Sequence, residues 1–317
     1  GLNNLKPIKE EGIQEDIITI KDELLYRYLM KEAITLVQNN DGLLPIKELT
    51  NNKIAYVKLG DSDNFNFTNT LKKYTQVDIV SDDSLISLLQ KLENYNTVII
   101  GYHKSNETPW KSFKMTKEEL TWLHEISKNN KVILDVFASP YTLLDIQDFK
   151  NIDAVLVSYQ NSKVSQEISA QMIFGALETK GKLPVSIKNI FPEGTGLSTP
   201  NLMRLSYTVP EEVDMDSKLL AKIDSVTTMV IDSLMAPGGQ VLVARYGKVI
   251  YHKSFGYQTY DKKQVVKLTD LYDLASVTKI IGGLPMIMKS EEIGLLDLDE
   301  TLGELMPYLK GSNKDTI

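Results

Sequence analysis

The sequence predicts an α/β protein, in which a doubly wound α/β/α sandwich with a mostly parallel sheet is followed by a second, α+β domain. Between residues 53 and 179, apolar runs of strand length alternate with helix-like stretches, the order typical of parallel strands joined by crossover helices. Each apolar run is continuous and not alternating, as expected for strands buried on both faces. A loop-like segment at 188–212 then ends the pattern, and different elements follow.

Composition narrows the classes of function. The chain has 317 residues, which suits two domains. Its formal net charge of -7 argues against broad attraction to nucleic acid or to anionic membranes. It contains no Cys and only 3 His, which excludes disulfides and thiolate sites, and we expect no metal site and no cofactor. No apolar run reaches the roughly 18 residues that a transmembrane helix needs.

The first helix is predicted directly after a polar lead. Residues 1–20 read as a linker that arrives from a preceding domain. A helix is expected over DELLYRYLMKEAITLVQNN, residues 22–40, and LLPI at 43–46 reads as a short buried segment. The apolar stripe of this helix is predicted to contain Leu25, Tyr28, Leu29, Ala33, Leu36 and Val37.

The sandwich is assigned to residues 21–190. Its strand-like runs are 53–59, 76–80, 96–102, 131–137 and 153–159. The helix-like stretches between and after them are 65–74, 82–93, 116–129 and 163–179. A last short strand, GKLPVSI at 181–187, is expected to close the domain.

The domain boundary is predicted in a segment rich in Pro, Gly, Ser and Thr that has no hydrophobic period. We assign residues 191–213 as the linker and 214–317 as the second domain.

The second domain is expected to open with a helix over 216–234. A hairpin of QVLVARYG and KVIYHKSFGY follows, turning at Tyr246-Gly247-Lys248. Another helix is expected to begin near Ser276.

Ser276 and Lys279 are the residues that point to chemistry, because they form the only Ser-x-x-Lys of the chain. Residues three apart on a helix lie on one face. Desolvation at the head of an apolar helix would lower the lysine pKa from its ordinary value of about 10.4, so that the amine could take the serine proton. Spacing alone favours the simpler alternative, in which Ser276 caps a helix and Lys279 is solvated.

Residues 214–317 resemble the opening of the serine β-lactamase and penicillin-binding-protein superfamily, in the branch of the class C enzymes and D-alanyl-D-alanine carboxypeptidases. The hairpin, the segment LYDLASVTK and the segment GLLDLDETLGELMPYL occur in the order of that family. The resemblance implies that Ser276 is the acylated nucleophile and that Lys279 assists proton transfer. It also implies an incomplete α+β serine β-lactamase-like domain.

Two further motifs of that superfamily are expected beyond Ile317. One is a Tyr- or Ser-centred Y-x-N or S-x-N, and the other is a K-T-G or H-x-G on a strand that lines the site. The chain alone is therefore expected to be inactive. Exposed apolar surface is expected where the missing C-terminal half of the domain would pack.

Residues 20–190 resemble the C-terminal α/β/α sandwich of glycoside hydrolase family 3. The resemblance rests on KEAITLVQNNDGLLPI and on QEISAQMIFGALETKGKLPVSI. The arrangement is similar to the β-N-acetylhexosaminidase branch, in which a preceding (β/α) barrel holds the nucleophilic Asp and a His–Asp acid/base pair. That resemblance implies a missing N-terminal barrel upstream of residues 1–20.

Four other polar residues are considered as candidate site residues, and a non-catalytic role is favoured for each. Some members of the sugar-hydrolase family carry a Glu acid/base on the sandwich, and Glu107 lies at the place to look, but a solvated loop carboxylate is favoured. His103, at the end of an expected strand, could face a ligand, but a structural role is favoured. His124 and His252 are interpreted as surface or packed residues.

Two functions remain open from the sequence. The first is a fragment of a bifunctional bacterial cell-wall hydrolase, acting on peptidoglycan-derived sugars or peptides, with the bacterial periplasm or cell envelope as the expected location. Within this reading, an esterase is a lesser possibility for the serine site. The alternative is a non-catalytic docking or scaffold module with a degenerate lactamase-like domain.

Overall fold

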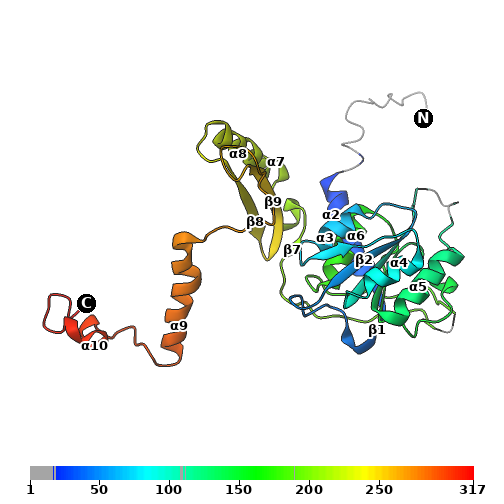
Figure 1. The fold of residues 1–317 in the computed structure, drawn as a ribbon, viewed down its shortest axis with the longest axis horizontal. Helices are drawn as coiled ribbons and strands as arrows, with labels where there is room; N and C mark the ends of the chain where they lie inside the picture. Colours follow the sequence, from blue (N-terminus) through cyan, green and yellow to red (C-terminus); the bar gives the residue numbers. More distant parts are fainter. Residues whose placement is uncertain (1–16, 18, 108–109, 111, 189) are drawn as a thin grey trace, which may run out of the picture.

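The computed structural model describes residues 17, 19–107, 110, 112–188 and 190–317. An α/β sandwich is followed by a small three-stranded unit, and the chain then runs out into two separate helices (Figure 1). Among the described residues, no helix combines the length and the apolar character needed to cross a lipid bilayer.

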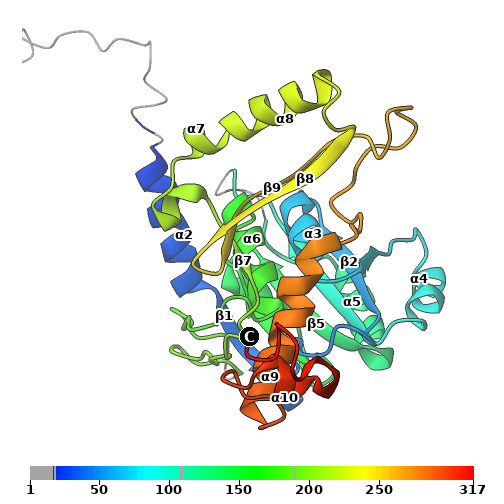
Figure 2. The ribbon, with the colours of Figure 1, turned by 90° about the vertical axis from the view of Figure 1, so that its left-hand side faces the viewer.

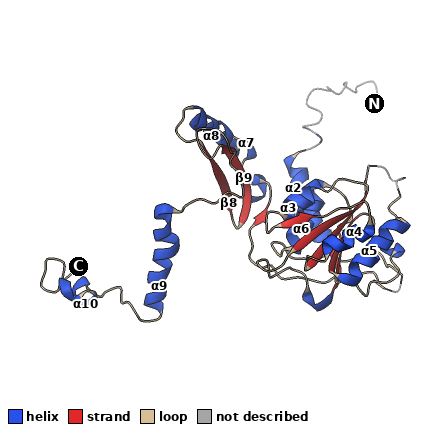
Figure 3. Ribbon diagram, in the orientation of Figure 1, coloured by secondary structure: helices blue, strands red, loops and turns tan. Residues whose placement is uncertain are grey.

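The sandwich contains the expected, mostly parallel sheet. Its six strands lie in the order β1-β6-β5-β4-β2-β3, and only β1 runs antiparallel to its neighbour. Figure 3 shows the strands enclosed by helices. The strands are β1 (Thr35–Asn39), β2 (Ile54–Gly60), β3 (Val77–Ile79), β4 (Thr97–His103), β5 (Lys131–Phe137) and β6 (Ala154–Val157).

Alternate residues of each central strand feed two separate cores. On β2, Ala55 and Val57 join the cluster that includes Leu88 of α4 (Leu85–Leu92). Ile54 and Tyr56 join the cluster on the other face. That second core is closed by α2 (Ile20–Ala33), α3 (Phe65–Leu71) and α6 (Lys163–Ile173), while α4 and α5 (Lys117–Asn129) close the first. Both faces are therefore covered, which explains the continuous apolar runs.

The first helix is shorter than predicted. It ends at Ala33, and the next residues form β1 instead of continuing to residue 40. Thr35 pairs with Val157 of β6. The β-branched residues after Ala33 suit a strand, and this pairing with β6 outweighs the helical spacing of the apolar residues.

The predicted apolar stripe of α2 is wrong as well. Leu25, Tyr28 and Leu29 are each more than half exposed, whereas Arg27 and Met30 are the buried residues. The helix therefore turns a charged residue toward the sandwich.

The expected closing strand at 181–187 does not form. Leu183 and Ile187 are buried. Among the described residues, the strand-like contact of this segment is an isolated bridge between Ile187 and Phe191. Pro184 has no N–H to donate to a ladder. A side chain at Gly181 would meet the backbone carbonyls of Ala33 and Ile34 at 2.4 Å, so the chain passes too close for anything but glycine.

The segment assigned as a linker is hydrogen-bonded along the sandwich. Leu197 N donates to Leu36 O at 2.7 Å, and Leu202 N donates to Gly175 O at 2.7 Å. The Arg204 guanidinium donates to the carbonyls of Ile46 and Phe174, both at 2.7 Å. This segment therefore straps the sandwich, and it ends in β7 (Ser206–Tyr207) and η4 (Pro210–Val213).

The second unit matches the predicted helix and hairpin. Helices α7 (Ser217–Leu220) and α8 (Lys222–Asp232) lie beside the hairpin of β8 (Gly238–Arg245) and β9 (Lys248–Gly256) (Figure 2). Tyr246 and Gly247 both have positive φ, 53° and 73°, as a tight two-residue hairpin turn requires. Strand β7 pairs with β9 in parallel and links this unit to the strap.

Apolar side chains of the C-terminal segments face solvent, as expected. These segments are η5 (Ala275–Val277), η6 (Lys279–Gly283), α9 (Leu284–Glu292), α10 (Leu302–Leu305) and η7 (Pro307–Leu309), and Figure 1 shows α9 standing away from the sandwich. Leu271, in the loop before η5, is 99% exposed, and Ile280 of η6 is 64% exposed. This much unpartnered apolar surface is unusual for an isolated domain.

Glu212 joins the two units. Its Oε1 accepts from Lys31 Nζ of α2 at 2.5 Å and from Lys248 Nζ of β9 at 2.6 Å. Its Oε2 accepts from the Thr208 hydroxyl and lies 4.0 Å from Arg27 Nε. Burial alone would raise the pKa of Glu212, but the hydrogen bonds from Lys248, Lys31 and Thr208 outweigh it and lower the pKa to about 2.

Replacing Glu212 is expected to loosen the hairpin from the sandwich. Glu212→Gln keeps the shape but leaves Lys31, Lys248 and Arg27 without their shared anion. Amide hydrogen exchange at Lys248 and Val249 should accelerate about tenfold or more, while the central sheet strands keep their protection. The exposed Glu193→Gln is the matched control, and unchanged exchange in Glu212→Gln would contradict this role.

Candidate functional site

The structure brings Ser276 and Lys279 together. Ser276 lies in η5, and Lys279 opens the π-helical turn η6 that leads into α9. Lys279 Nζ donates to Ser276 Oγ at 3.1 Å. The two side chains are therefore within proton-transfer distance of each other.

Irregular backbone sets this geometry. Ala275, directly before the serine, has φ of 43°, and its N–H donates to the Asp273 carboxylate at 2.9 Å. A non-glycine residue in this left-handed region costs of order 1 kcal/mol. A π-helical turn follows at once, and both features are over-represented at functional sites.

The pair is not shielded from water by the described residues. Ser276 and Lys279 are both exposed, whereas the sequence pattern predicts an apolar surrounding for the lysine. Apolar side chains are present nearby, but Val277 and Ile281 are themselves 52% and 58% exposed. The described residues thus bring a serine hydroxyl and a lysine amine together, but form no enclosed pocket around them.

His103 has the structural role that the sequence favours. It is fully buried and stacks on Phe137, with ring centroids 4.4 Å apart. Its Nδ1 lies 2.8 Å from Asn161 Oδ1 and its Nε2 2.9 Å from the Tyr56 hydroxyl. Because Asn161 Oδ1 also accepts from Gln166, we assign the proton to Nδ1. Burial lowers the pKa of His103 to about 4, so the ring is neutral at pH 7.

A buried carboxyl group lies in the middle of the sheet. Asp135 of β5 is fully buried and accepts hydrogen bonds from the hydroxyls of Ser158, at 2.7 Å, and Ser169. Burial raises the pKa of Asp135 to about 7, although both serine hydrogen bonds oppose the shift. An aspartate inside a continuous apolar strand was the available sequence signal for this group.

The other weighed residues lie apart from the serine pair. Glu107 lies in the loop after β4 and is exposed, and His124 is exposed on α5. His252, interpreted from sequence as strand surface, lies on β9 and lines a cavity. Among the described residues, no group of three or more His, Asp or Glu could hold a metal ion.

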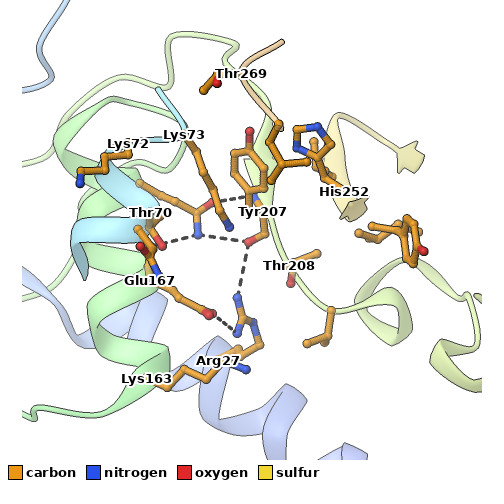
Figure 4. A pocket seen from close by; sticks show the side chains of 17 residues that line it. Arg27, Thr70, Lys72, Lys73, Lys163, Glu167, Tyr207, Thr208, His252 and Thr269 are labelled. Carbon is orange, nitrogen blue, oxygen red and sulfur yellow. Dashed lines mark hydrogen bonds and ion pairs between the residues drawn. The ribbon is translucent and has the colours of Figure 1, made fainter. Parts of the chain in front are cut away.

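That cavity, of about 740 Å³, lies between the sandwich and the second unit (Figure 4). Helices α2, α3 and α6 line one side, and β7, β9 and the loop around Thr269 line the other. No sequence pattern predicts this site, because its cationic residues come from elements that are distant in the sequence. The adjacent Lys72 and Lys73 at the end of α3 were the one local signal.

Comparisons with known proteins identify two segments. Residues 34–218 match the family model of the glycosyl hydrolase family 3 C-terminal domain. Residues 228–317 match the beta-lactamase family model. The two matches follow one another in the order predicted from the sequence.

Similar proteins cover parts of the chain. Protein flp of Staphylococcus aureus is 33% identical over 89 residues, 28% of this chain and 18% of flp. Penicillin-binding protein 4* of Bacillus subtilis is 36% identical over 69 residues, 22% of this chain and 15% of that protein. Among solved structures, a fungal multi-domain GH3 beta-N-acetylglucosaminidase has 18% sequence identity to this chain and a TM-score of 0.45. The alignment covers 82% of this chain and 32% of the fungal chain. The chain thus spans less than a fifth of these two curated relatives.

The Asp135 carboxyl gives a pH-dependent stability. The folded chain holds this proton more tightly than the unfolded chain, whose aspartate has the ordinary pKa of 3.8. The resulting stabilisation is complete below pH 3.8 and is lost as pH rises through about 7.

Asp135→Asn imitates the protonated carboxyl and should remove this dependence. Relative to the parent, the variant should gain about 3 kcal/mol in free energy of unfolding between pH 4 and pH 7. Urea unfolding across this range measures it, with the exposed Asp148→Asn as the control. Parallel pH profiles for parent and Asp135→Asn would contradict the assignment.

Proposed function

We propose, from the premise that this chain belongs to the glycosyl hydrolase family 3 C-terminal domain family, that it is part of a bifunctional bacterial cell-wall hydrolase. One activity would be that of a β-N-acetylhexosaminidase. The other would be a serine acyl-transfer hydrolase of the β-lactamase, D-alanyl-D-alanine carboxypeptidase or esterase type. Both chemistries suit peptidoglycan-derived substrates in the bacterial envelope, one acting on the sugar and the other on the peptide or an ester.

The order of the two matched segments supports a fusion. A sugar-hydrolase sandwich at 34–218 precedes a beta-lactamase match at 228–317, and the Glu212 ion pairs hold the two against each other. The glycosidase chemistry would come from a barrel elsewhere in the same polypeptide, because the described polar clusters of the sandwich are structural. The sandwich would then position that barrel and not react itself.

The observation that carries the serine half is the 3.1 Å contact between Lys279 Nζ and Ser276 Oγ. In the proposed step, the neutral Lys279 amine takes the proton of Ser276 as Oγ bonds to the substrate carbonyl carbon. The protonated amine then gives this proton to the departing nitrogen or oxygen as the scissile bond breaks. Water hydrolyses the acyl-serine ester in a second cycle of the same transfers.

The described residues by themselves are proposed to be inactive. The pair lies open to solvent, and an oxyanion needs fixed donors in a site that excludes water. The exposed apolar residues of η6 and α9 would become buried when further parts of the hydrolase domain pack on them. That packing would also desolvate Lys279, as a lysine base requires.

The same exposure favours a second candidate, a docking or scaffold module. If the lactamase-like unit is degenerate, Ser276 and Lys279 are an ordinary helix start, and the sandwich serves only to bind. Acylation distinguishes the two candidates, because a docking module has no need of a nucleophile.

Covalent labelling tests the serine proposal. The natural polypeptide that contains this chain should be acylated at Ser276 by a fluorescent penicillin or an activated ester. Ser276→Ala should abolish labelling, and Lys279→Gln should slow it by about 100-fold or more. In-gel fluorescence and mass spectrometry of the Ser276 peptide measure this.

Thr278→Ala, which leaves both groups in place, is the matched control and should label normally. The isolated 317-residue chain should remain unlabelled. Persistent labelling of Ser276→Ala, or complete absence of labelling in the natural polypeptide with both probe classes, would support the docking module instead.

A further inference from the structure

The cavity between the two units is strongly cationic, although the chain as a whole has a net charge of -7. Its lining contains four basic side chains against one carboxylate. The basic residues are Arg27, Lys72, Lys73 and Lys163, and the carboxylate is Glu167. Excess positive charge in a partly enclosed space attracts anions of matching size.

Most of this positive charge is uncompensated. Arg27 is compensated: its Nη1 lies 2.8 Å from Glu167 and 3.9 Å from Glu23, and its Nε lies 4.0 Å from Glu212. Within the described part of the chain, Lys72, Lys73 and Lys163 have no carboxylate within 4.0 Å. All three lysines are exposed, so their ammonium groups face solvent and are open to an anionic ligand.

Arg27 is positioned as a fixed element of the wall. It is 2% exposed, and besides Glu167 it donates to the Tyr207 carbonyl at 3.4 Å. Its Nε has no hydrogen-bond partner among the described residues. Figure 4 shows Lys73 beside Tyr207 and Arg27 below it, where Arg27 donates to the Tyr207 carbonyl.

The opposite wall offers a surface for a ring. Lys73 Nζ lies 4.2 Å from the centroid of the Tyr207 ring, so the phenol ring borders the cationic region. Val249 and Leu268 add apolar surface, and Thr208 and Thr269 also line the cavity. A volume of about 740 Å³ is within the range of small-molecule sites.

We propose that this cavity binds a phosphate monoester, with its phosphoryl group between Lys73, Lys163 and Arg27 and its organic body against Tyr207. A phosphate monoester carries a charge of about −2 near pH 7 and three acceptor oxygens, so it matches the excess of about three positive charges better than a monocarboxylate does. Arginine and lysine are the side chains that phosphate groups favour. This site is separate from the Ser276 pair and does not depend on the function proposed above.

The basic residues of the lining lower one another's pKa values, which is the effect that a bound anion would counteract. Burial lowers the pKa of Lys73; Glu167 opposes this shift, while Arg27 and Lys163 add to it. The pKa of His252 is lowered by burial and by Lys73, which leaves this ring neutral near pH 7. A bound dianion would offset the mutual repulsion of the cations.

Isothermal titration calorimetry of the 317-residue chain at low salt tests the proposal with three probes that share one ring. These are phenyl phosphate, benzoate and phenol. Phenyl phosphate should bind most tightly, benzoate at least about tenfold more weakly, and phenol not measurably. Rising salt should weaken phenyl phosphate binding.

Variants locate the site. Lys73→Gln with Lys163→Gln should reduce phenyl phosphate affinity about tenfold or more, whereas the exposed Lys150→Gln should leave it unchanged. Circular dichroism confirms that each variant is folded. The proposal is overturned if benzoate binds as tightly as phenyl phosphate, if phenyl phosphate does not bind, or if Lys150→Gln weakens binding as much as the double variant does.

Discussion

The Glu212 carboxylate is the contact on which the arrangement of the two units depends. It lies at the end of the strap and binds Lys31 from the sandwich and Lys248 from the hairpin on the same oxygen. A carboxylate shared by two ammonium groups in a half-buried setting has a fixed place, because leaving any one partner unpaired there is costly. The hairpin is thereby held over α2, and the β7–β9 pairing extends this contact into a sheet.

The cavity follows from this contact. Arg27 lies one turn before Lys31 on α2, so the helix that supplies one Glu212 partner also supplies a wall residue. Strand β9 does the same, with Lys248 at the junction and Val249 to His252 along the lining. The cavity therefore lies at the boundary between the two units, a place where small-molecule pockets commonly occur. The serine pair, by contrast, depends on none of these contacts.

Much of the fold was predictable from the sequence, because parallel strands buried on both faces leave long apolar runs. The runs at 96–102 and 131–137 became β4 and β5 almost residue for residue. The predictions were wrong where contacts between distant parts of the chain determine the local structure. The residues after Ala33 pair with β6 as a strand, and the buried side of α2 contains Arg27, which no hydrophobic period reveals.

The same contrast holds for the sites. Ser276 and Lys279 are three residues apart, so their contact could be inferred from local spacing. The cavity lysines come from α3 and α6, and its arginine from α2, so only the folded chain brings them together. Asp135 is intermediate, since an aspartate in an apolar strand indicates a buried carboxyl but not its two serine partners.

The central claim is that this chain joins a sugar-hydrolase sandwich to the acylating segment of a serine hydrolase within one longer polypeptide. The most direct measurement is the natural open reading frame on both sides of residues 1–317. We predict a (β/α) barrel upstream, and downstream a Y-x-N or S-x-N motif followed by a K-T-G or H-x-G motif. A frame that begins near Gly1 and stops near Ile317 would contradict the claim, since neither active site could then be assembled.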